Sequence, residues 1–317
     1  MKKYLYLFLT FFTFFSCSTR PTYINTAFEK DLIINSRQIL NADSSEKLEI
    51  YFPLFTDNNN EPIGGDGIVI IFPNKSVMVI DGFYSSAANS FIKFLKEDLK
   101  IEKIDYLVAT HFHADHIGSF SKILDSFQVL NFYSNGAPLN SSLSSSLLEK
   151  VKQLGITETV LKEGDYFKIA DVSIDVLWPS LSEKDLYKIY YEPGKTAETI
   201  NLSSLVMKMT FKDFSILFTG DLYKKGEGIL VKKYGDLLKS TILKAPHHGD
   251  PYTSNSRKFL LTVNPELTIA QTPTDFLFFT KARFVTLNKH LVKVEKPGFI
   301  KIETTGFGYT VSEYIEE

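Results

Sequence analysis

Apolar runs with a strand-like or helix-like spacing alternate along most of the chain, and polar turns separate them. In both halves, pairs of short β-prone runs come first and amphipathic stretches follow, an order typical of an α/β fold with two layered sheets. The first half predicts strands at 48–55, 68–72, 76–80, 104–109 and 128–133 and helices at 86–99, 117–127 and 141–154. The second half predicts strands at 166–169, 172–178, 203–211, 215–219, 242–245 and 267–270, helices at 224–238 and 254–263, and terminal β segments at 276–287 and 299–311.

Two polar regions interrupt this pattern. Residues 18–47 predict a tether with a short helix at 28–39. Residues 179–200 form an insertion that we expect to border the active site, although it also fits a surface excursion. Its aromatic residues are suited to stack on bases or to enclose a choline group, or else to form an ordinary helix packing face; they are Tyr187, Tyr190 and Tyr191.

The composition allows a large core but argues against bulk electrostatic binding of nucleic acid. The 317 residues are 44% hydrophobic and 14% aromatic, enough for one large α/β domain or two smaller ones. The formal net charge is -2, from 35 basic and 37 acidic side chains, and loss of Lys2 and Lys3 with a signal peptide would make it -4. This near-neutral charge argues against a protein that binds nucleic acid through a large excess of basic side chains, but it allows a local basic groove.

The N-terminus has the organisation of a targeting segment. Lys2 and Lys3 precede an apolar run at 4–15, which is too short to span a bilayer, and Cys17 follows at the expected cleavage site. The segment resembles a bacterial lipoprotein signal, which implies a signal peptide at 1–16 and a lipidated Cys17. We therefore expect an exported protein, anchored by lipid at the cell envelope; the alternatives are an ordinary secretory signal, giving a secreted or periplasmic protein, and an uncleaved short anchor. Cys17 is the only cysteine, so no intrachain disulfide is possible.

Three of the six histidines and one aspartate lie together at a predicted strand-to-helix turn, after the strand at 104–109. In extended backbone alternate side chains share a face, so His111, His113 and Asp115 are placed to point the same way, and His116 turns in as the helix begins. Imidazole and carboxylate suit zinc or a similar divalent ion, and an open catalytic site usually takes three protein ligands. Four such residues therefore suggest two metals, the alternative being a histidine-rich surface turn.

Other residues suited to bind metals also follow predicted strands. Asp221 ends the run Leu217-Phe218-Thr219-Gly220-Asp221, and His247 and His248 follow the strand at 242–245. A carboxylate at a strand end beside glycine is well placed to bridge two cations. Each motif alone is weak, since Gly-Asp is common in plain turns, but the ordered set of three predicts a metal site.

The order HxHxDH, TGD, HHG resembles the metallo-β-lactamase fold superfamily, and within it the branch that includes the hydrolase domain of ComEC-type competence proteins. The similarity covers most of residues 61–270. Its matching segments are Gly65-Asp66-Gly67, Asp81-Gly82, the histidine cluster, 201–205, 218–221 and 243–249. The resemblance implies a four-layer αββα sandwich, formed here by residues 48–317, with a site for two metals on one edge.

The resemblance also implies roles for individual residues. It assigns His111 and His113 to one metal, Asp115 and His116 to the other, Asp221 as the bridge and His248 as the last ligand. The two divalent ions would be zinc, with manganese as an alternative. His247 would contact the substrate or support the ligands, and either Asp115 or His247 would carry a proton during catalysis.

Two departures from the family pattern affect this assignment. Many members have a further histidine between the first cluster and the bridging aspartate, but residues 117–246 contain none. The first metal would then have only His111, His113 and Asp221, with solvent and help from Asn201, a residue that we also expect to contact the substrate, so we expect that metal to bind weakly. The second departure is Asp250, where this branch usually has serine.

We expect a hydrolase that attacks phosphodiester bonds with a hydroxide bridging the metals. Two divalent cations carry more charge than the inner carboxylates and a hydroxide neutralise, which favours an anionic substrate. Candidate substrates are nucleic acid, surface phosphodiesters and phosphocholine-type esters; no obligate protein partner is inferred. One alternative is hydrolysis of a carboxylic ester, lactone or lactam by the same metals. The other is a non-catalytic surface lipoprotein that retains the fold for binding.

Overall fold

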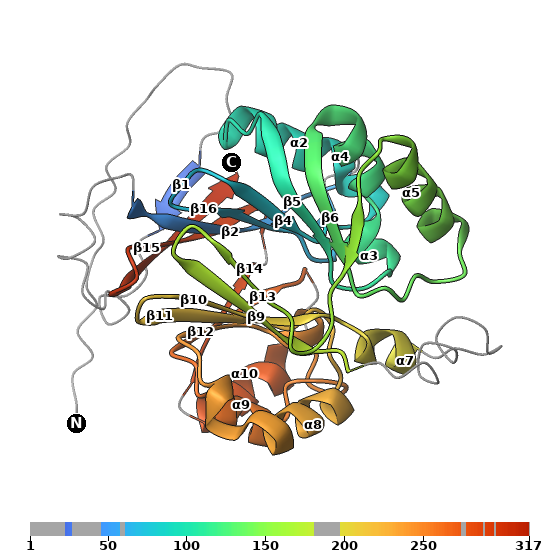
Figure 1. The fold of residues 1–317 in the computed structure, drawn as a ribbon. Coiled ribbons are helices and arrows are strands. Elements are labelled where there is room, and N and C mark those ends of the chain that lie inside the picture. The colour runs from blue at the N-terminus through green and yellow to red at the C-terminus, as the bar shows by residue number, and fades with distance from the viewer. Residues whose placement is uncertain are drawn as a thin grey trace, which may run out of the picture.

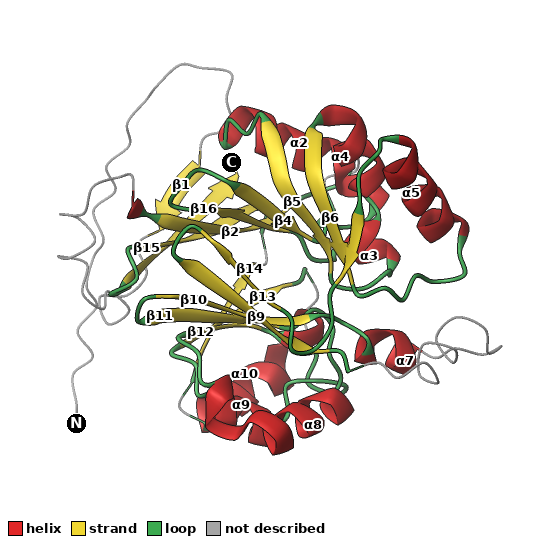
Figure 2. Ribbon diagram, viewed as in Figure 1, coloured by secondary structure: helices red, strands yellow, loops and turns green. Residues whose placement is uncertain are grey.

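Two β-sheets lie face to face in the middle of the protein, and helices cover the outer face of each sheet (Figure 1). The computed structural model describes residues 23–26, 46–57, 61–180, 197–273, 277–287, 289–294 and 296–316. The layers run helix, sheet, sheet, helix, as Figure 2 shows, so the predicted αββα fold is confirmed. Several predicted features lie outside the described residues: the signal peptide, Cys17, the helix at 28–39 and the three insertion tyrosines.

The first sheet contains nine strands in the order β1-β16-β15-β2-β3-β4-β5-β6-β7. Pairing is parallel from β4 through β7 and antiparallel elsewhere, so β4, β5 and β6 end at the same edge. The strands are β1 Tyr23–Thr26, β2 Leu48–Leu54, β3 Ile68–Ile71, β4 Val77–Ile80, β5 Lys103–Ala109, β6 Gln128–Ser134, β7 Glu158–Val160, β15 Gly298–Thr304 and β16 Tyr309–Glu316.

The second sheet contains seven strands in the order β14-β13-β12-β11-β10-β9-β8. Pairing is parallel from β11 through β14, which brings the ends of β11 and β12 side by side. The strands are β8 Tyr166–Ile169, β9 Val172–Trp178, β10 Val206–Phe211, β11 Phe214–Phe218, β12 Ile242–Lys244, β13 Leu267–Gln271 and β14 His290–Val294.

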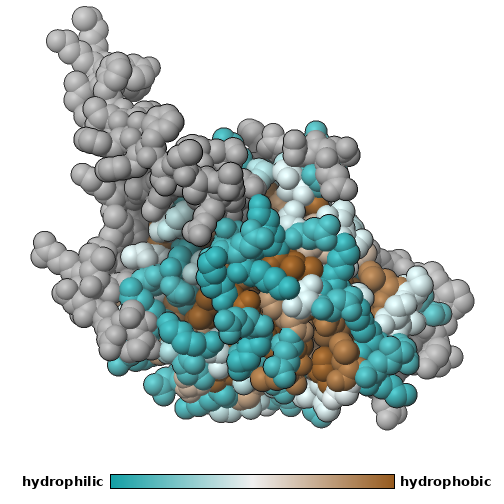
Figure 3. All heavy atoms as spheres, turned by 90° about the horizontal axis from the view of Figure 1, so that it is seen from above, coloured by the Kyte–Doolittle hydropathy of each residue, from teal (hydrophilic) through white to brown (hydrophobic). Residues whose placement is uncertain are grey.

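Most helices form the two outer layers, whereas α7 lies beside the sheets (Figure 1). The outer face of the first helical layer exposes many hydrophilic side chains, with hydrophobic surface between them (Figure 3). Among the described residues, no helix has the length and the apolar character needed to cross a membrane. The helices are α2 Ala88–Lys93, α3 Ala114–Ile117, α4 Phe120–Ser126, α5 Ser142–Gln153, α7 Ala197–Leu202, α8 Lys224–Tyr234, α9 Arg257–Val263 and α10 Leu277–Thr286, with 3-10 turns at Ser85–Ala87, Gly235–Leu238 and Pro246–Gly249 and a π-helical turn at Phe94–Asp98.

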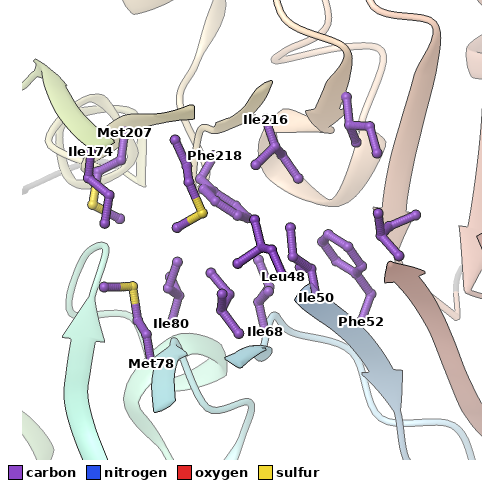
Figure 4. Close-up of a cluster of buried hydrophobic side chains, with 14 of the residues drawn as sticks. Leu48, Ile50, Phe52, Ile68, Met78, Ile80, Ile174, Met207, Ile216 and Phe218 are labelled. Atoms are coloured by element: carbon purple, nitrogen blue, oxygen red, sulfur yellow. The ribbon is translucent and has the colours of Figure 1, made fainter. Parts of the chain in front are cut away.

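The main core lies between the two sheets. Alternate residues of β2, such as Leu48, Ile50 and Phe52, point from the first sheet toward Ile216 and Phe218 of the second (Figure 4). Their neighbours on the opposite face of the first sheet pack under its helices. Full burial of a side chain of this size contributes about 1.5–3 kcal/mol. The paired sheets are therefore a stiff base for the loops at their edge.

The prediction of a β segment at 276–287 is wrong, because Leu277–Thr286 forms the helix α10. Aromatic and β-branched residues suggested a strand, but the buried positions Thr280, Phe284 and Leu287 are spaced four and three residues apart. That spacing places them on one face of a helix, which packs on the second sheet. Strand β14 His290–Val294 was not predicted, because its mixture of polar and apolar residues shows no clear alternation of the kind expected for a strand.

A half-buried ion-pair network joins β2 and β15. Lys301 Nζ lies 2.6 Å from Glu49 Oε1 and 2.9 Å from Glu303 Oε2, and Lys47 Nζ lies 2.7 Å from Glu303 Oε1. Burial alone would raise the pKa of Glu303, but its hydrogen bonds to Lys47 and Lys301 lower it below 4.5.

We expect Glu303→Gln to lower the free energy of unfolding by about 1 kcal/mol at pH 7. A depressed folded-state pKa stabilises the protein above the unfolded-state pKa, and this contribution is lost as pH falls through the folded-state pKa. The difference from wild type should therefore shrink steadily in urea unfolding below pH 4.5, with chelator in all samples. An equal difference at every pH would contradict a charge-based role.

Candidate metal centre

The predicted metal-binding residues converge at the edge where β5, β11 and β12 end. Three groups of side chains have ligand atoms within 4.8 Å of one another; Asp221 belongs to two of them, and the third contains Asp66, Asp81 and His116. The first half of the chain supplies the histidine cluster after β5, and the second supplies Asp221 and the histidine pair after β11 and β12. The two halves are joined here, since Leu205 N donates to Thr110 O at 2.9 Å and His247 N donates to Gly220 O at 3.1 Å.

The turn after β5 takes its shape from local sequence. His113 has extended backbone (φ -75, ψ 153) and is the N-cap of the short helix α3, whose residues His116 and Ile117 are buried. Gly118 follows, where a Cβ atom would lie 2.4 Å from Ser85 N and 2.5 Å from Ala114 O. Glycine is therefore needed for the cluster to fold back against the neighbouring loop.

The larger group contains Asp115, His116, Asp221 and His248. Asp221 Oδ2 lies 3.2 Å from His116 Nε2 and 3.4 Å from His248 Nε2. Asp115 Oδ2 lies 3.3 Å from His248 Nε2 and 3.8 Å from His116 Nε2. Ligands about 2.0–2.1 Å from a tetrahedral ion are separated by about 3.4 Å. The four side chains therefore have the spacing that a tetrahedral ion requires.

Three buried polar atoms in this group make no hydrogen bond with any described residue: His116 Nε2, Asp221 Oδ1 and His248 Nε2. Buried polar atoms nearly always have a partner, so atoms without one need an explanation. Two imidazole nitrogens and a carboxylate oxygen are ligands that zinc and similar ions accept. The residues present therefore fit a divalent metal.

The smaller group, which corresponds to the first metal of the sequence assignment, contains His111, His113 and Asp221. His111 Nδ1 lies 3.1 Å from Thr110 Oγ1, which leaves Nε2 facing His113 Nδ1 at 3.0 Å and Asp221 Oδ2 at 4.0 Å. Among the described His, Cys, Asp and Glu side chains, no fourth belongs to this group. It is the less complete of the two.

Asp81 orients His116 from behind the site. It follows β4 in a left-handed conformation (φ 59) and is 1% exposed. Its carboxylate accepts from Thr110 N at 2.8 Å, Thr110 Oγ1 at 2.7 Å and His116 Nδ1 at 2.8 Å. Nδ1 of His116 carries the proton in this bond, so in the neutral imidazole that binds a metal the lone pair is on Nε2, which faces Asp221.

Burial lowers the pKa of a histidine at this site, whereas the nearby carboxylates raise it, so His111 and His116 shift in opposite directions. Burial holds the pKa of His111 well below 6.5, which favours the neutral form that a metal ligand needs. Burial would also lower the pKa of His116, but Asp221, Asp81 and Asp115 raise it well above 6.5. The centre therefore has a strongly negative potential that favours bound cations.

His247 and His248 occupy a strained turn. Both residues have left-handed backbone, with φ 49 and φ 53, which costs of order 1–3 kcal/mol each and is common at functional sites. Asn255 stabilises the turn, since its Nδ2 donates to Pro246 O at 2.9 Å and Asp250 O at 3.1 Å. Because of this turn, the His248 imidazole lies beside Asp115 and Asp221, and the His247 imidazole lies farther from Asp221.

His248 lies in the larger ligand group, whereas His247 lies at its border. His247 Nε2 is 3.8 Å from Asp221 Oδ2, and its Nδ1 is 2.7 Å from Thr253 Oγ1, which in turn donates to Asp250. Of the two histidines only His248 belongs to a ligand group, and the division of roles between them stays a prediction. The geometry also gives Asp250, the departure from the family pattern, a contact with His247.

Asn201 is buried in α7, and its Oδ1 makes no hydrogen bond with any described residue. Its backbone oxygen accepts from Ser204 N at 3.1 Å. No recorded contact joins its side chain to the described histidines, so its role toward the first metal or the substrate stays a prediction.

Sequence reasoning assigned no role to three buried charged residues beside the ligands: Asp66, Asp81 and Lys244, each 1% exposed. The signal for the aspartates was their position beside glycine at strand boundaries. The signal for Lys244 was a charged residue inside an apolar strand, which is rare unless it is paired.

We expect Gly65→Ala to disturb the site through the backbone of Asp115. Gly65 has φ 108, and a Cβ atom there would lie 2.4 Å from Asp115 O. The substitution should cost at least about 2 kcal/mol in chemical unfolding and weaken metal binding. Gly155→Ala is the control, because Gly155 also has positive φ (69) but no atom within 4 Å of the added Cβ. It should cost about 1 kcal/mol and leave metal binding unchanged; equal effects of both variants would contradict the explanation.

A family model described as the metallo-beta-lactamase superfamily matches residues 64–271, more than half of the chain. The protein therefore belongs to this superfamily. The solved structure of the metallo-beta-lactamase fold protein YhfI from Bacillus subtilis superposes with a TM-score of 0.51. It covers 80% of this chain and 99% of YhfI at 10% sequence identity, a likeness that shows the fold.

Two competence proteins are similar in sequence. ComE operon protein 3 of Bacillus subtilis (strain 168) is 27% identical over 169 residues, which are 53% of this chain and 20% of that protein. Competence protein ComA of Neisseria gonorrhoeae is 44% identical over 70 residues, which are 22% of this chain and 10% of that protein. The chain thus spans a fifth or less of the length of these relatives. The similarity supports the predicted ComEC-like branch.

Proposed function

We propose that the protein is a phosphodiesterase that uses two divalent metal ions, zinc or manganese. The observation that carries this proposal is the position of Asp221, whose carboxylate is shared by both ligand groups. A shared carboxylate would hold two cations close together, an arrangement typical of enzymes that cleave phosphate esters. The likeness to the competence proteins supports this class of substrate.

Bound metals would lower the pKa of water and stabilise charge on the phosphate oxygens. The chain's own residues orient the ligands and move protons. Thr253 and Asp250 hold His247 Nδ1 as a donor, so its Nε2 is free to accept a proton at the border of the centre. The side chain is 24% exposed, which gives it access to substrate. We assign the proton transfer to His247, with Asp115 as the second candidate.

The balance of charge favours an anionic substrate. Asp115 and Asp221 are the carboxylates of the two ligand groups, so two divalent cations and one hydroxide would leave one net positive charge among these inner groups. Behind them, the charge of Asp66 is paired with Lys244. A phosphodiester supplies one negative charge and matches this balance, whereas a neutral ester does not.

The N-terminal sequence supports a location outside the cytoplasm for the proposed activity. Lys2 and Lys3, the apolar run at 4–15 and Cys17 follow the order of a lipoprotein signal. A lipid on Cys17 would hold the domain at the membrane surface, with residues 17–47 as the tether. The substrate would then be extracellular nucleic acid or a phosphodiester of the cell surface.

A substrate panel tests the proposed reaction. Purified protein saturated with zinc or manganese should hydrolyse bis-p-nitrophenyl phosphate faster than it hydrolyses a lactone, a thioester or a β-lactam. His290→Ala is a matched control, because His290 is the one histidine exposed on a strand away from the centre, and it should retain full activity. Turnover of the lactone, thioester or β-lactam without cleavage of the diester would contradict the proposal.

A further inference from the structure

A lysine and an aspartate form a buried ion pair between the two sheets, directly behind the metal centre. Lys244 ends β12 of the second sheet, and Asp66 lies just before β3 of the first. Lys244 Nζ contacts Asp66 Oδ2, and each side chain is 1% exposed. Lys244 Nζ also lies 3.5 Å from Gly220 O, the carbonyl before Asp221. The pair therefore connects the loop before β3 with the two loops that supply Asp221 and His248.

Asp66 contacts two residues of the larger ligand group. Its Oδ1 accepts from His248 Nδ1 at 3.1 Å, and its backbone N donates to Asp115 O at 3.2 Å. Since a carboxylate only accepts, His248 Nδ1 carries the proton, and in the neutral imidazole that binds a metal the lone pair is then on Nε2. Asp66 thus sets both the orientation and the tautomer of His248.

Asp66 and Asp81 each orient a histidine, but different groups compensate the charges of the two carboxylates. Asp81 holds His116 in the same way, but its remaining donors are the neutral groups Thr110 N and Oγ1. For Asp66 the compensating donor is the ammonium group of Lys244, at the edge of an otherwise apolar strand. Burying two charges is costly, and apolar residues often fill such a space with equal or greater stability. The pair is therefore better explained by positioning than by stability.

Lys244 is placed to act through Asp66 and not on the substrate. Its ammonium group is enclosed and committed to Asp66 and the Gly220 carbonyl. We propose that Lys244 and Asp66 are a positioning pair that holds His248 in the geometry required by the second metal. The inference rests on the proposed metal centre but not on the identity of the substrate.

Metal affinity measured without substrate tests this proposal. Zinc titration against a chromophoric chelator should show that Asp66→Asn and Lys244→Met each weaken the His248-containing site by about 10–100-fold. The site formed by His111 and His113 should keep its affinity. The double variant should be no weaker than the worse single variant, because both substitutions break one chain of contacts. Cobalt absorption spectra should change only for the ion bound at the His248-containing site.

A matched lysine is available as a control. Lys208 on β10 is half-buried and donates to Leu237 O at 2.8 Å and Lys239 O at 2.7 Å, away from the described metal-binding residues. Lys208→Met should leave both metal affinities unchanged. If Lys244→Met fails to fold, the zinc affinities of the nearly isosteric variant Asp66→Asn test the proposal.

The proposal would be overturned if the zinc affinity of the His248-containing site were unchanged in Asp66→Asn, or if both metal sites were weakened equally. Wild-type protein that binds no metal would overturn it as well. If the affinities shift as expected while no phosphodiester is cleaved, the positioning pair stands and the proposed reaction falls.

Discussion

Replacing Asp221 with alanine is expected to abolish phosphodiester hydrolysis and to remove tight binding of both metals. Its Oδ2 lies 3.2 Å from His116 Nε2, 3.4 Å from His248 Nε2 and 4.0 Å from His111 Nε2. Loss of this shared ligand leaves each metal one ligand short and removes the negative charge between them. We expect activity to fall by about a thousandfold or more, on the scale of losing a principal catalytic group. Metal content by mass spectrometry and diester cleavage measure the two effects.

Asp115→Ala is the informative control for that variant. Asp115 belongs only to the larger ligand group, so its loss should weaken one metal and leave the other bound. Asp221→Ala that kept two tightly bound metals, or a wild-type rate, would show that the carboxylate is not shared.

The two adjacent histidines are expected to give different defects. His248→Ala should lose the second metal, because His248 Nε2 lies 3.3 Å from Asp115 Oδ2 and 3.4 Å from Asp221 Oδ2. His247→Ala should keep both metals and lower kcat by about 100- to 10,000-fold, the usual contribution of a general acid or base. Metal titration and steady-state kinetics on both variants separate these outcomes.

His290→Ala controls for the loss of any histidine and should match wild type in both assays. Loss of a metal from His247→Ala, with full retention in His248→Ala, would reverse the assignment. Equal loss of metal in both variants would indicate that the strained turn acts as one unit.

The local part of the site could be predicted from sequence because it depends on short-range geometry. His111, His113 and His116 follow an apolar strand, and strand periodicity followed by a helical turn is enough to gather them. Asp221 and His248 were also predictable as strand-end residues. Their approach to the cluster depends on how the sheets stack, and it was inferred from resemblance.

The supporting residues could not be predicted in the same way. Lys244 and Asp66 are 178 positions apart, and their pairing follows only from the packing of β12 beside the loop before β3. Helix α10 shows the opposite problem: its aromatic residues suggested a strand, but burial of Thr280 and Phe284 on one helical face decided its structure. In both cases contacts distant in sequence outweighed local preference.

The central claim is a two-metal centre whose ligands come from both halves of the chain. The most direct test is a zinc titration of wild-type protein and His113→Ala, monitored by calorimetry. Two ions per wild-type chain are predicted, with the weaker one lost in His113→Ala, because the group of His111, His113 and Asp221 has only three protein ligands. A single ion in wild type, unaffected by His113→Ala, would contradict the account, as would the absence of binding.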